Sequence, residues 1–472
     1  MFKRFFFSFS LLLIFSISGW TSVQTYFSPH GGAHDAIVRD ILEAKKSIDI
    51  AMYNFSSSKI LGALQTVKKK KPRIAIRMIF DDAANTEGDA PGATSKSDQS
   101  EALEHLGVDI RYVSKIMHHK FVIIDGFPDG LKGDEDFSHT VLLNGSGNFS
   151  SRADTGHDEN LAEIRNEPEI TTDFQKEFQL MWNYSYDFPD DSEQSDRPSY
   201  QTTLSSSPSI APVFTSSNFK TTVKFPLNGN RVVSWSLESA IRSAKKSIYV
   251  ATGHFRLKPL ADALIEAKKE NPNLDIRVIL DTQEHITPRA HEEQMSRYRQ
   301  RPDELAGKMK FSRYLSEGGI DTRIKYAAYI FYYAIDPQMH HKYMVIDGTD
   351  VWSGSYNWSR NAEFNTFENV VHYSGEELSE VAQSYTENFL NIWDKNRDSF
   401  QDHKRDIQKQ SRIPLHFDPM SLWVSEIDEL YDLLEKEVPG FFEKIKPEDM
   451  YWAKRKINSR NTKKKKKRGE RR

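Results

Sequence analysis

Residues 44–55 read AKKSIDIAMYNF and residues 244–255 read AKKSIYVATGHF, so one turn and one strand-like run recur 200 positions apart. A second match follows at the same offset, IAIRMIFD at 74–81 and LDIRVILD at 274–281. Self-similarity at a constant offset is the signature of an internal duplication. The chain is therefore predicted to contain two copies of one folding unit.

Helical patterns lie between the strand-like runs of each copy. The apolar positions are Ile60, Leu61, Leu64 and Val67 in the first copy, and Leu260, Ala263, Leu264 and Ala267 in the second. Strands that alternate with helices predict an α/β fold. We expect each copy to form a mixed, mostly parallel sheet flanked by helices.

Composition fits a soluble globular protein, because 38% of the 472 residues are hydrophobic and 28% are charged. The net charge of −3 neither indicates nor excludes a nucleic-acid binder. The chain contains no cysteine. This excludes disulfides, a thiolate nucleophile, cysteine-ligated zinc and a lipid-modified N-terminal cysteine.

The N-terminus has the layout of a secretory signal. Lys3 and Arg4 precede an apolar run from Phe5 to Trp20, and small polar residues follow. The alternatives are an uncleaved anchor or a buried helix, although a membrane-spanning helix needs about 20 apolar residues. We therefore expect residues 1–22 to be a signal peptide and the protein to be exported, either periplasmic or secreted.

The rest of the chain divides by composition. A stretch rich in Ser, Pro, Asp and Thr separates the two copies, and a Lys- and Arg-rich stretch of low complexity ends the chain. The predicted parts are a first repeat at 23–185, a linker at 186–222, a second repeat at 223–400, a helical extension at 401–455 and a disordered basic tail at 456–472.

Each copy carries the pattern H-x-K-x4-D. The first reads MHHKFVIIDG at 117–126 and the second reads MHHKYMVIDG at 339–348. Residues two apart on a strand share a face, so a base or nucleophile lies beside a fixed cation, which suits attack on a phosphate diester. The residues are His118, Lys120 and Asp125 in the first copy, and His340, Lys342 and Asp347 in the second. His119 and His341 should point to the opposite face and are interpreted as structural.

Two further motifs follow in the same order in both copies. GSGNFS at 145–150 and GSYNWS at 354–359 place uncharged hydrogen-bonding groups after a glycine turn. Ser146, Asn148, Ser355 and Asn357 are therefore candidates for binding phosphate oxygens. Glu159 and Glu368 come next, and a carboxylate near an imidazole can orient it. Glu159 follows His118 by 41 residues and Glu368 follows His340 by only 28.

These paired blocks resemble the phospholipase D superfamily over about residues 26–395. The opening YFSPHGG at 26–32 is especially similar to the bacterial endonuclease branch, which has one motif per chain and dimerises. The resemblance implies two phospholipase D-like repeats packed as a pseudo-two-fold pair around one site. The chain would then be a monomer with an internal pseudo-dimer.

The resemblance also implies roles for residues. The family's catalytic pattern maps onto His118, Lys120, Asn148 and Glu159, and onto their equivalents in the second copy, while the motif aspartates are more structural than catalytic. It implies a two-step reaction through a phosphohistidine, with His118 as the nucleophile and His340 as the general acid. No metal or other cofactor is expected.

The motifs leave the substrate open. Hydrolysis of phospholipids at a membrane surface is the first hypothesis. A nuclease of the same superfamily, a phosphatidyl transferase similar to cardiolipin synthases and a non-enzymatic binding role are the alternatives. Two basic runs, 68–71 and 463–468, are interpreted as solvated charge or as contacts to anionic lipid or nucleic acid. The aromatic segment 326–337 is either buried structure or an apolar lip over the site.

Overall fold

The computed structural model describes residues 22–81, 102–130, 135–187, 209–302, 307–332, 335–409, 413 and 415–445. The predicted signal peptide lies outside these residues except for Ser22, and the predicted basic tail lies wholly outside them. No helix in these ranges is both long and apolar enough to cross a membrane.

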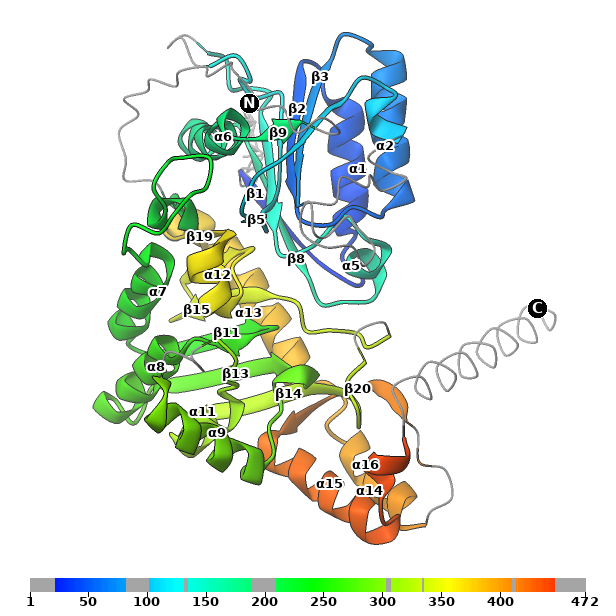
Figure 1. The fold of residues 1–472 in the computed structure, drawn as a ribbon, viewed down its shortest axis with the longest axis vertical. Helices are drawn as coiled ribbons and strands as arrows, with labels where there is room; N and C mark the ends of the chain where they lie inside the picture. The colour runs from blue at the N-terminus through cyan, green and yellow to red at the C-terminus, as the bar shows by residue number, and fades with distance from the viewer. Residues whose placement is uncertain are drawn as a thin grey trace, which may run out of the picture.

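The first half of the chain forms one sheet with its helices (Figure 1). Its elements are β1 (Val23–Phe27), α1 (Ala33–Glu43), β2 (Ser47–Met52), α2 (Ser58–Lys70), β3 (Ala75–Phe80), β4 (Asp109–Tyr112), β5 (Ile116–Met117), β6 (Lys120–Ile124), β7 (Val141–Gly145), α5 (Ser151–Thr155), β8 (Asn160–Arg165), α6 (Pro168–Asn183) and β9 (Tyr186–Asp187).

The second half forms another sheet with its own helices. Its first elements are β10 (Ile210–Phe214), η1 (Thr215–Asn218), α7 (Val232–Ser243), β11 (Ser247–Thr252), β12 (Phe255–Arg256), α8 (Lys258–Glu270), β13 (Asp275–Asp281), η2 (Thr282–Glu284), α9 (Pro288–Gln300), α11 (Ser312–Glu317) and β14 (Asp321–Ala328). They are followed by β15 (Lys342–Ile346), β16 (Asp350–Gly354), β17 (Trp358–Ser359), α12 (Arg360–Asn365), β18 (Thr366–Phe367), β19 (Asn369–Tyr373), η3 (Glu376–Leu378), α13 (Ser379–Trp393), α14 (Ser399–Gln408), β20 (His416–Trp423), α15 (Val424–Glu437) and α16 (Phe441–Lys444).

The two sheets have the same topology. Their strand orders are β1-β8-β7-β6-β2-β3-β4-β9 and β10-β19-β16-β15-β11-β13-β14-β20. The register also repeats, because Met52 pairs with Lys120 in the first sheet and Thr252 pairs with Lys342 in the second. The predicted pair of repeats in a mixed α/β fold is therefore confirmed.

The prediction of mostly parallel sheets is wrong. Only two of the seven pairings between described strands in each sheet are parallel, β2–β3 and β3–β4 in the first and β11–β13 and β13–β14 in the second. Parallel neighbours need a long crossover, whereas short connections join antiparallel strands. The short segment between β15 and β16 makes an antiparallel hairpin of the motif strand and its successor.

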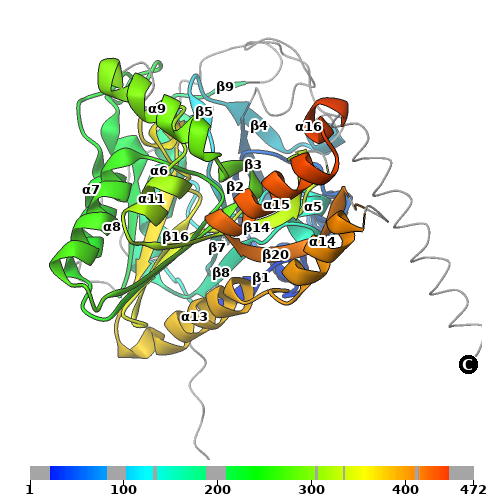
Figure 2. The same cartoon turned by 90° about the horizontal axis from the view of Figure 1, so that it is seen from below.

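The boundaries drawn from composition need two corrections. Residues 210–214, predicted as part of the linker, form β10, which pairs with β19 at the edge of the second sheet. The extension predicted to be helical contains β20, which pairs with β14 at the opposite edge. In Figure 2, β20 lies at the border of the fold beside α14 and α15. The Ser- and Pro-rich composition of the linker obscured β10, and the helical patterns on both sides of residues 416–423 obscured β20.

Three apolar cores hold the molecule together. One fills the space between the first sheet and helices α1 and α2, and a second lies between the second sheet and its outer helices. The third is shared, since Phe121 and Ile123 of β6 and Tyr343 and Val345 of β15 all belong to it. Alternation along each motif strand therefore directs one set of side chains toward the other half.

Helices exchanged between the halves complete the shared core. Helix α6 of the first half contacts β10 of the second, and α13 of the second half contacts β1 of the first. In Figure 1, α6 lies beside the first sheet and α13 lies beside the second. This reciprocal packing explains why the second sheet starts with a strand taken from the region between the repeats.

The aromatic segment at 326–337 is mainly internal. Tyr326 and Tyr329 are buried in the outer core of the second half, where they pack on Phe417. Residues 333–334 lie outside the described residues. The described part therefore agrees with the buried interpretation rather than with an exposed lip.

A buried ion pair joins the halves on one side only. Nζ of Lys325 in β14 lies 2.7 Å from Oδ2 of Asp158, and the two residues are only 3% and 4% exposed. By strand register, the position in the first half that corresponds to Lys325 is Val113. The position in the second half that corresponds to Asp158 is Phe367. One side of the interface is therefore ionic where the other side is apolar.

Removing one partner of this pair should destabilise the protein. We expect Lys325→Met to lower the free energy of unfolding by about 3–5 kcal/mol, because Asp158 is left as a buried, unpaired charge. The double variant Lys325→Met with Asp158→Leu should lose clearly less, since no buried charge remains. Urea denaturation of the full chain measures both. Equal stability of the two variants would contradict an energetic role for the pair.

Candidate active site

Short backbone bridges between the halves position the motif histidines. The N–H of His118 donates to the carbonyl of Phe367 (3.0 Å), where β5 pairs with β18. The N–H of His340 donates to the carbonyl of Asp158 (3.0 Å), next to a bridge between Asp158 and Met339. Each motif histidine is thus anchored by the segment that precedes the other half's glutamate.

The side chains cross between the halves in the same way. Nδ1 of His118 lies 2.8 Å from Oε1 of Glu368, and Nδ1 of His340 lies 2.7 Å from Oε1 of Glu159. Both glutamates are at most 2% exposed. Because each carboxylate takes the Nδ1 side of an imidazole, Nε2 is the nitrogen left to react. The sequence predicted the two glutamates as site residues, but it did not predict that each would pair with the histidine of the other half.

Burial sets the protonation of these pairs. Desolvation, together with the charges of Lys120 and Lys342, holds the pKa of each motif histidine well below its usual value. Desolvation raises the pKa of Glu159 and of Glu368 to about 7, against the opposing effect of the lysines. The imidazoles of His118 and His340 are therefore neutral near pH 7, and a neutral imidazole is the form that can act as a nucleophile.

Each motif lysine contacts the backbone of the histidine two residues before it, and its charge acts on both motif histidines. Nζ of Lys120 donates to the carbonyl of His118, and Nζ of Lys342 donates to that of His340, both at 2.6 Å. Burial lowers the pKa of Lys120 to about 7 and that of Lys342 to about 8. Each lysine also lowers the pKa of the other half's histidine, so the four groups form one site.

The asparagines border this site. Asn148 and Asn357 are partly exposed, and the Oδ1 atom of each is buried without a hydrogen bond among the described residues. An incoming phosphate could accept from their amide nitrogens. Their predicted role in phosphate binding therefore remains open.

The serines are placed differently from the prediction. Ser146 and Ser355 are fully buried. The Ser146 hydroxyl donates to Oε2 of Glu159 (2.7 Å) and accepts from the N–H of Asn160 (3.0 Å). Ser355 accepts from the N–H of Asn369 at the same distance. The serines hold the glutamate segments in place, and direct contact with phosphate is not supported, because the loop turns them inward while the asparagines stay at the rim.

The motif aspartates are structural, and they explain the repeated AKKS. Carboxylate oxygens of Asp125 accept from the backbone N–H groups of residues 45, 46 and 47, and those of Asp347 accept from residues 245, 246 and 247. Although burial opposes it, these backbone donors hold the pKa of Asp347 below its usual value. Both aspartates adopt φ 54°, a left-handed conformation that Asp tolerates better than most residues.

Two further carboxylates were missed by sequence reasoning. Oδ2 of Asp81 accepts from the N–H of Met117 (2.8 Å), and Oδ2 of Asp281 accepts from that of Met339 (2.7 Å). Both aspartates are buried, and each binds the residue that immediately precedes a motif histidine. Their signal was visible, because the strand-like runs at 74–81 and 274–281 both end in Asp.

The second histidine of each motif makes a crossed contact of its own. The Asn369 amide donates to Nδ1 of His119 (3.0 Å), while Nδ1 of His341 donates to Oδ1 of Asn160 (3.3 Å). Both histidines are fully buried. Their predicted structural role agrees with this placement, since each ties its motif to the Glu-Asn pair of the other half.

A family match agrees with this geometry. The family described as "Cardiolipin synthase, PLD-like domain" matches residues 37–182 and 237–393, which is more than half of the chain and one match in each half. The chain belongs to the phospholipase D superfamily. The crossed histidines are thus the paired motif histidines of a phospholipase D-like fold.

The curated relatives match a smaller part of this chain than the family does. Mitochondrial cardiolipin hydrolases of Xenopus laevis and Drosophila melanogaster are 31% and 33% identical, over 33% and 31% of this chain and 63% and 57% of their own length. The chain thus spans about three fifths of these relatives. The phosphatidylserine synthase of Haemophilus influenzae has a similar fold, with a TM-score of 0.54, 12% identity, and coverage of 88% of this chain and 92% of its own. Nuc of Salmonella typhimurium, a phospholipase D family member, is 27% identical over 35% of this chain and 97% of its own, with a TM-score of 0.28.

The described part of this phospholipase D-like chain contains no group of three or more His, Asp or Glu side chains arranged to hold a metal ion. Metal independence of the reaction stays a prediction that only an assay can test. The site itself supplies two imidazoles and two lysine amines that act on one another electrostatically.

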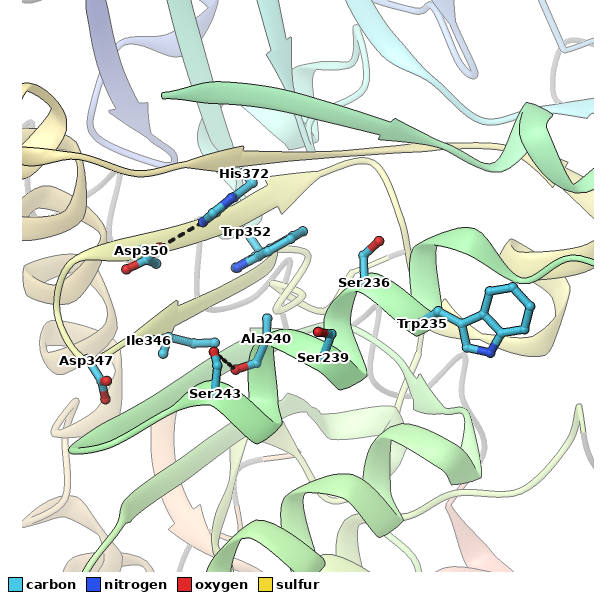
Figure 3. A pocket seen from close by; sticks show the side chains of 10 residues that line it. All are labelled: Trp235, Ser236, Ser239, Ala240, Ser243, Ile346, Asp347, Asp350, Trp352 and His372. Carbon is cyan, nitrogen blue, oxygen red and sulfur yellow. Dashed lines mark hydrogen bonds and ion pairs between the residues drawn. The ribbon is translucent and has the colours of Figure 1, made fainter. Parts of the chain in front are cut away.

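A groove of about 600 Å³ lies elsewhere on the second half (Figure 3). Trp352 and His372 stack there at 4.2 Å, and Nε2 of His372 donates to Asp350 (2.9 Å). Ile346 and Asp347 line it at the far end of β15 from His340. A strand rises about 3.3 Å per residue, so this groove is separate from the phospholipase D-like site.

The shifted pKa values predict a narrow pH optimum. The value of kcat/KM should fall below about pH 7, as Glu159 and Glu368 become protonated, and should fall again above about pH 7–8, as Lys120 and Lys342 lose their charge. Initial rates between pH 5 and 10 measure this. Lys120→Arg should move the alkaline limb upward, because guanidinium does not titrate in this range. A flat profile from pH 6 to 9 would contradict these assignments.

Proposed function

We propose that this protein is a phosphodiesterase that hydrolyses the head-group phosphodiester bond of phospholipids through a phosphohistidine. One observation carries the proposal: each motif histidine is oriented by the other half's glutamate, so two reactive Nε2 atoms share one cationic site. A phosphodiester needs a nucleophile on one side of phosphorus and a proton donor on the other. The crossed pairs offer both.

The first step is attack by Nε2 of His118 on phosphorus. The phosphorus–oxygen bond to the head-group alcohol breaks, and the leaving oxygen takes a proton from Nε2 of His340. Burial and the charges of Lys342 and Lys120 lower the pKa of His340, so it can hold that proton once the anionic phosphate offsets those charges and while Glu159 stays ionised beside it. Lys120 and Lys342 offset the charge of the phosphoryl oxygens.

In the second step, His340 takes a proton from water, and the resulting hydroxide attacks the phosphohistidine. The phosphorus–nitrogen bond breaks, His118 is restored and phosphatidic acid leaves. His118 is assigned as nucleophile from its position in the first copy, as in two-motif relatives of the family.

The lipid substrate is supported by the relatives rather than by the site, because the same groups would cleave a nucleic acid. The matched proteins of Xenopus laevis and Drosophila melanogaster are named cardiolipin hydrolases. The signal-like N-terminus supports export to the periplasm or medium. Both halves of the site come from one chain, which supports action as a monomer.

Incubation with lipid vesicles and with plasmid DNA, each in EDTA, tests this function. We expect choline release from phosphatidylcholine vesicles, no nicking of the plasmid, and no loss of rate on chelation. His118→Ala and His340→Ala should each remove most turnover, whereas His372→Ala, a control in the separate groove, should not. Lys120→Ala or Lys342→Ala should cost about 10²–10³ in rate. Plasmid cleavage without choline release would replace lipid by nucleic acid as the substrate.

Trapping of the covalent intermediate tests the two histidine roles. Brief incubation with phosphate-labelled lipid, an alkaline quench that preserves phosphohistidine, and peptide mapping should place the label on the peptide that contains His118. Label on the peptide with His340 would reverse the assignment. Full activity of either alanine variant would rule out a shared site.

A further inference from the structure

The two halves differ beside the catalytic motifs. At the 200-residue offset, Asn54 and Ser56 of the first half correspond to His254 and Arg256 of the second. One side of the site therefore carries an imidazole and a guanidinium where the other side carries an amide and a hydroxyl. A duplicated site that differs at matched positions is a place to look for substrate selection.

His254 is adjacent to the motif of the second half. The N–H of its neighbour Gly253 donates to the carbonyl of His341 (3.1 Å). A Cβ on Gly253 would lie 2.6 Å from the carbonyl oxygen of Met339 and 3.6 Å from Cα of His340. Only glycine allows so close an approach, and this approach brings His254 next to the active site.

A buried carboxylate fixes the orientation of His254. Glu284 is fully buried, and its Oε1 lies 3.1 Å from Nδ1 of His254. The same oxygen accepts hydrogen bonds from Nε (2.9 Å) and Nη2 (2.7 Å) of Arg256. The side chains of His254 and Arg256 are 26% and 28% exposed. Like the two motif histidines, His254 thus has a carboxylate at Nδ1, which leaves its Nε2 for another partner.

Two further cations lie near His254 and Glu284. Arg256 and Lys310 both lie in the field of Glu284, and Lys310 also lies in the field of Asp281. A charge on His254 reaches both motif histidines, since it lowers the pKa of His118 and of His340. His254 therefore lies within electrostatic range of both motif histidines.

One phosphodiester does not need these groups. Its two non-bridging oxygens already have one motif lysine each, Lys120 and Lys342. A further fixed cation on one side of the site is complementary to a second anionic group in the same substrate.

We propose that His254, held by Glu284 and flanked by Arg256, binds a second phosphate of the substrate and so selects phospholipids whose head group carries another phosphodiester. The choice of a lipid rests on the proposed function, whereas the subsite rests on the contacts of His254 alone. Its test therefore needs one measurement that does not depend on lipid hydrolysis.

Calorimetric binding of soluble probes to the full chain supplies that measurement. Glycerol 1,3-bisphosphate and glycerol 3-phosphate differ only in the second phosphate. The wild-type protein should bind the bisphosphate about tenfold to a hundredfold more tightly, the change expected from one charge-assisted hydrogen bond. His254→Gln should lose this preference yet keep its affinity for the monophosphate. Arg256→Met should weaken the preference, and the matched first-half variant Asn54→Gln should retain it.

Lipid assays then test the substrate. Phosphatidylglycerol and cardiolipin share a glycerol head group, but only cardiolipin carries a second phosphate on it. In mixed micelles, His254→Gln should lower kcat/KM for cardiolipin about tenfold or more and change that for phosphatidylglycerol less than about twofold.

The outcomes separate the two proposals. Equal binding of both probes by the wild-type protein overturns the subsite, and so does a variant that weakens both probes or both lipids alike. Hydrolysis of neither lipid, together with a preference for the bisphosphate that His254→Gln removes, leaves the subsite standing and overturns the lipid function.

Discussion

The crossing of histidine and glutamate between the halves is the constraint on which the rest of the structure depends. Each half carries a histidine that only the other half's glutamate orients, and backbone bridges from residues 118 and 340 fix the exchange. Neither motif histidine has its carboxylate partner within its own half. The shared apolar core, with α6 and α13 packed across the interface, therefore serves the chemistry as well as stability.

Burying so many ionisable groups in one interface is unfavourable unless they are paired. The molecule responds by shifting their protonation: burial lowers the pKa of Lys120 to about 7 and raises that of Glu368 to about 7. Both shifts reduce the number of charged groups that are buried before substrate binds. An anionic phosphodiester has the opposite effect on the lysines and imidazoles, because its negative charge favours their protonated forms. The cost of burying these cations therefore favours the binding of an anion.

Much of this arrangement could be predicted, because duplication doubles every local signal. A lone His-x-Lys carries little information, whereas His118 and His340 with the same neighbours identify both the fold and the reactive residues. What sequence reasoning missed depends on three-dimensional partners. Glu159 lies closer in sequence to His118, yet its carboxylate pairs with His340. Ser146 has the residue type of a phosphate ligand, but the loop turns its hydroxyl inward to Glu159. Edge strand β10 depends on contact with α6, which leaves no periodicity in a Ser- and Pro-rich segment.

The positions that break the pseudo-symmetry suggest why two repeats were joined in one chain. In a symmetric dimer, both sides of a shared site are identical by construction. A phosphodiester is not symmetric, since one side carries the leaving alcohol and the other the retained group. Fusion lets Tyr53 pack on His118 while Gly253 closely approaches the backbone of Met339 and His340. It also lets Asp158 and Lys325 form an ion pair on one side alone. The reactive groups stay matched because the two steps use the same chemistry, whereas their surroundings diverge because the two ends of the substrate differ.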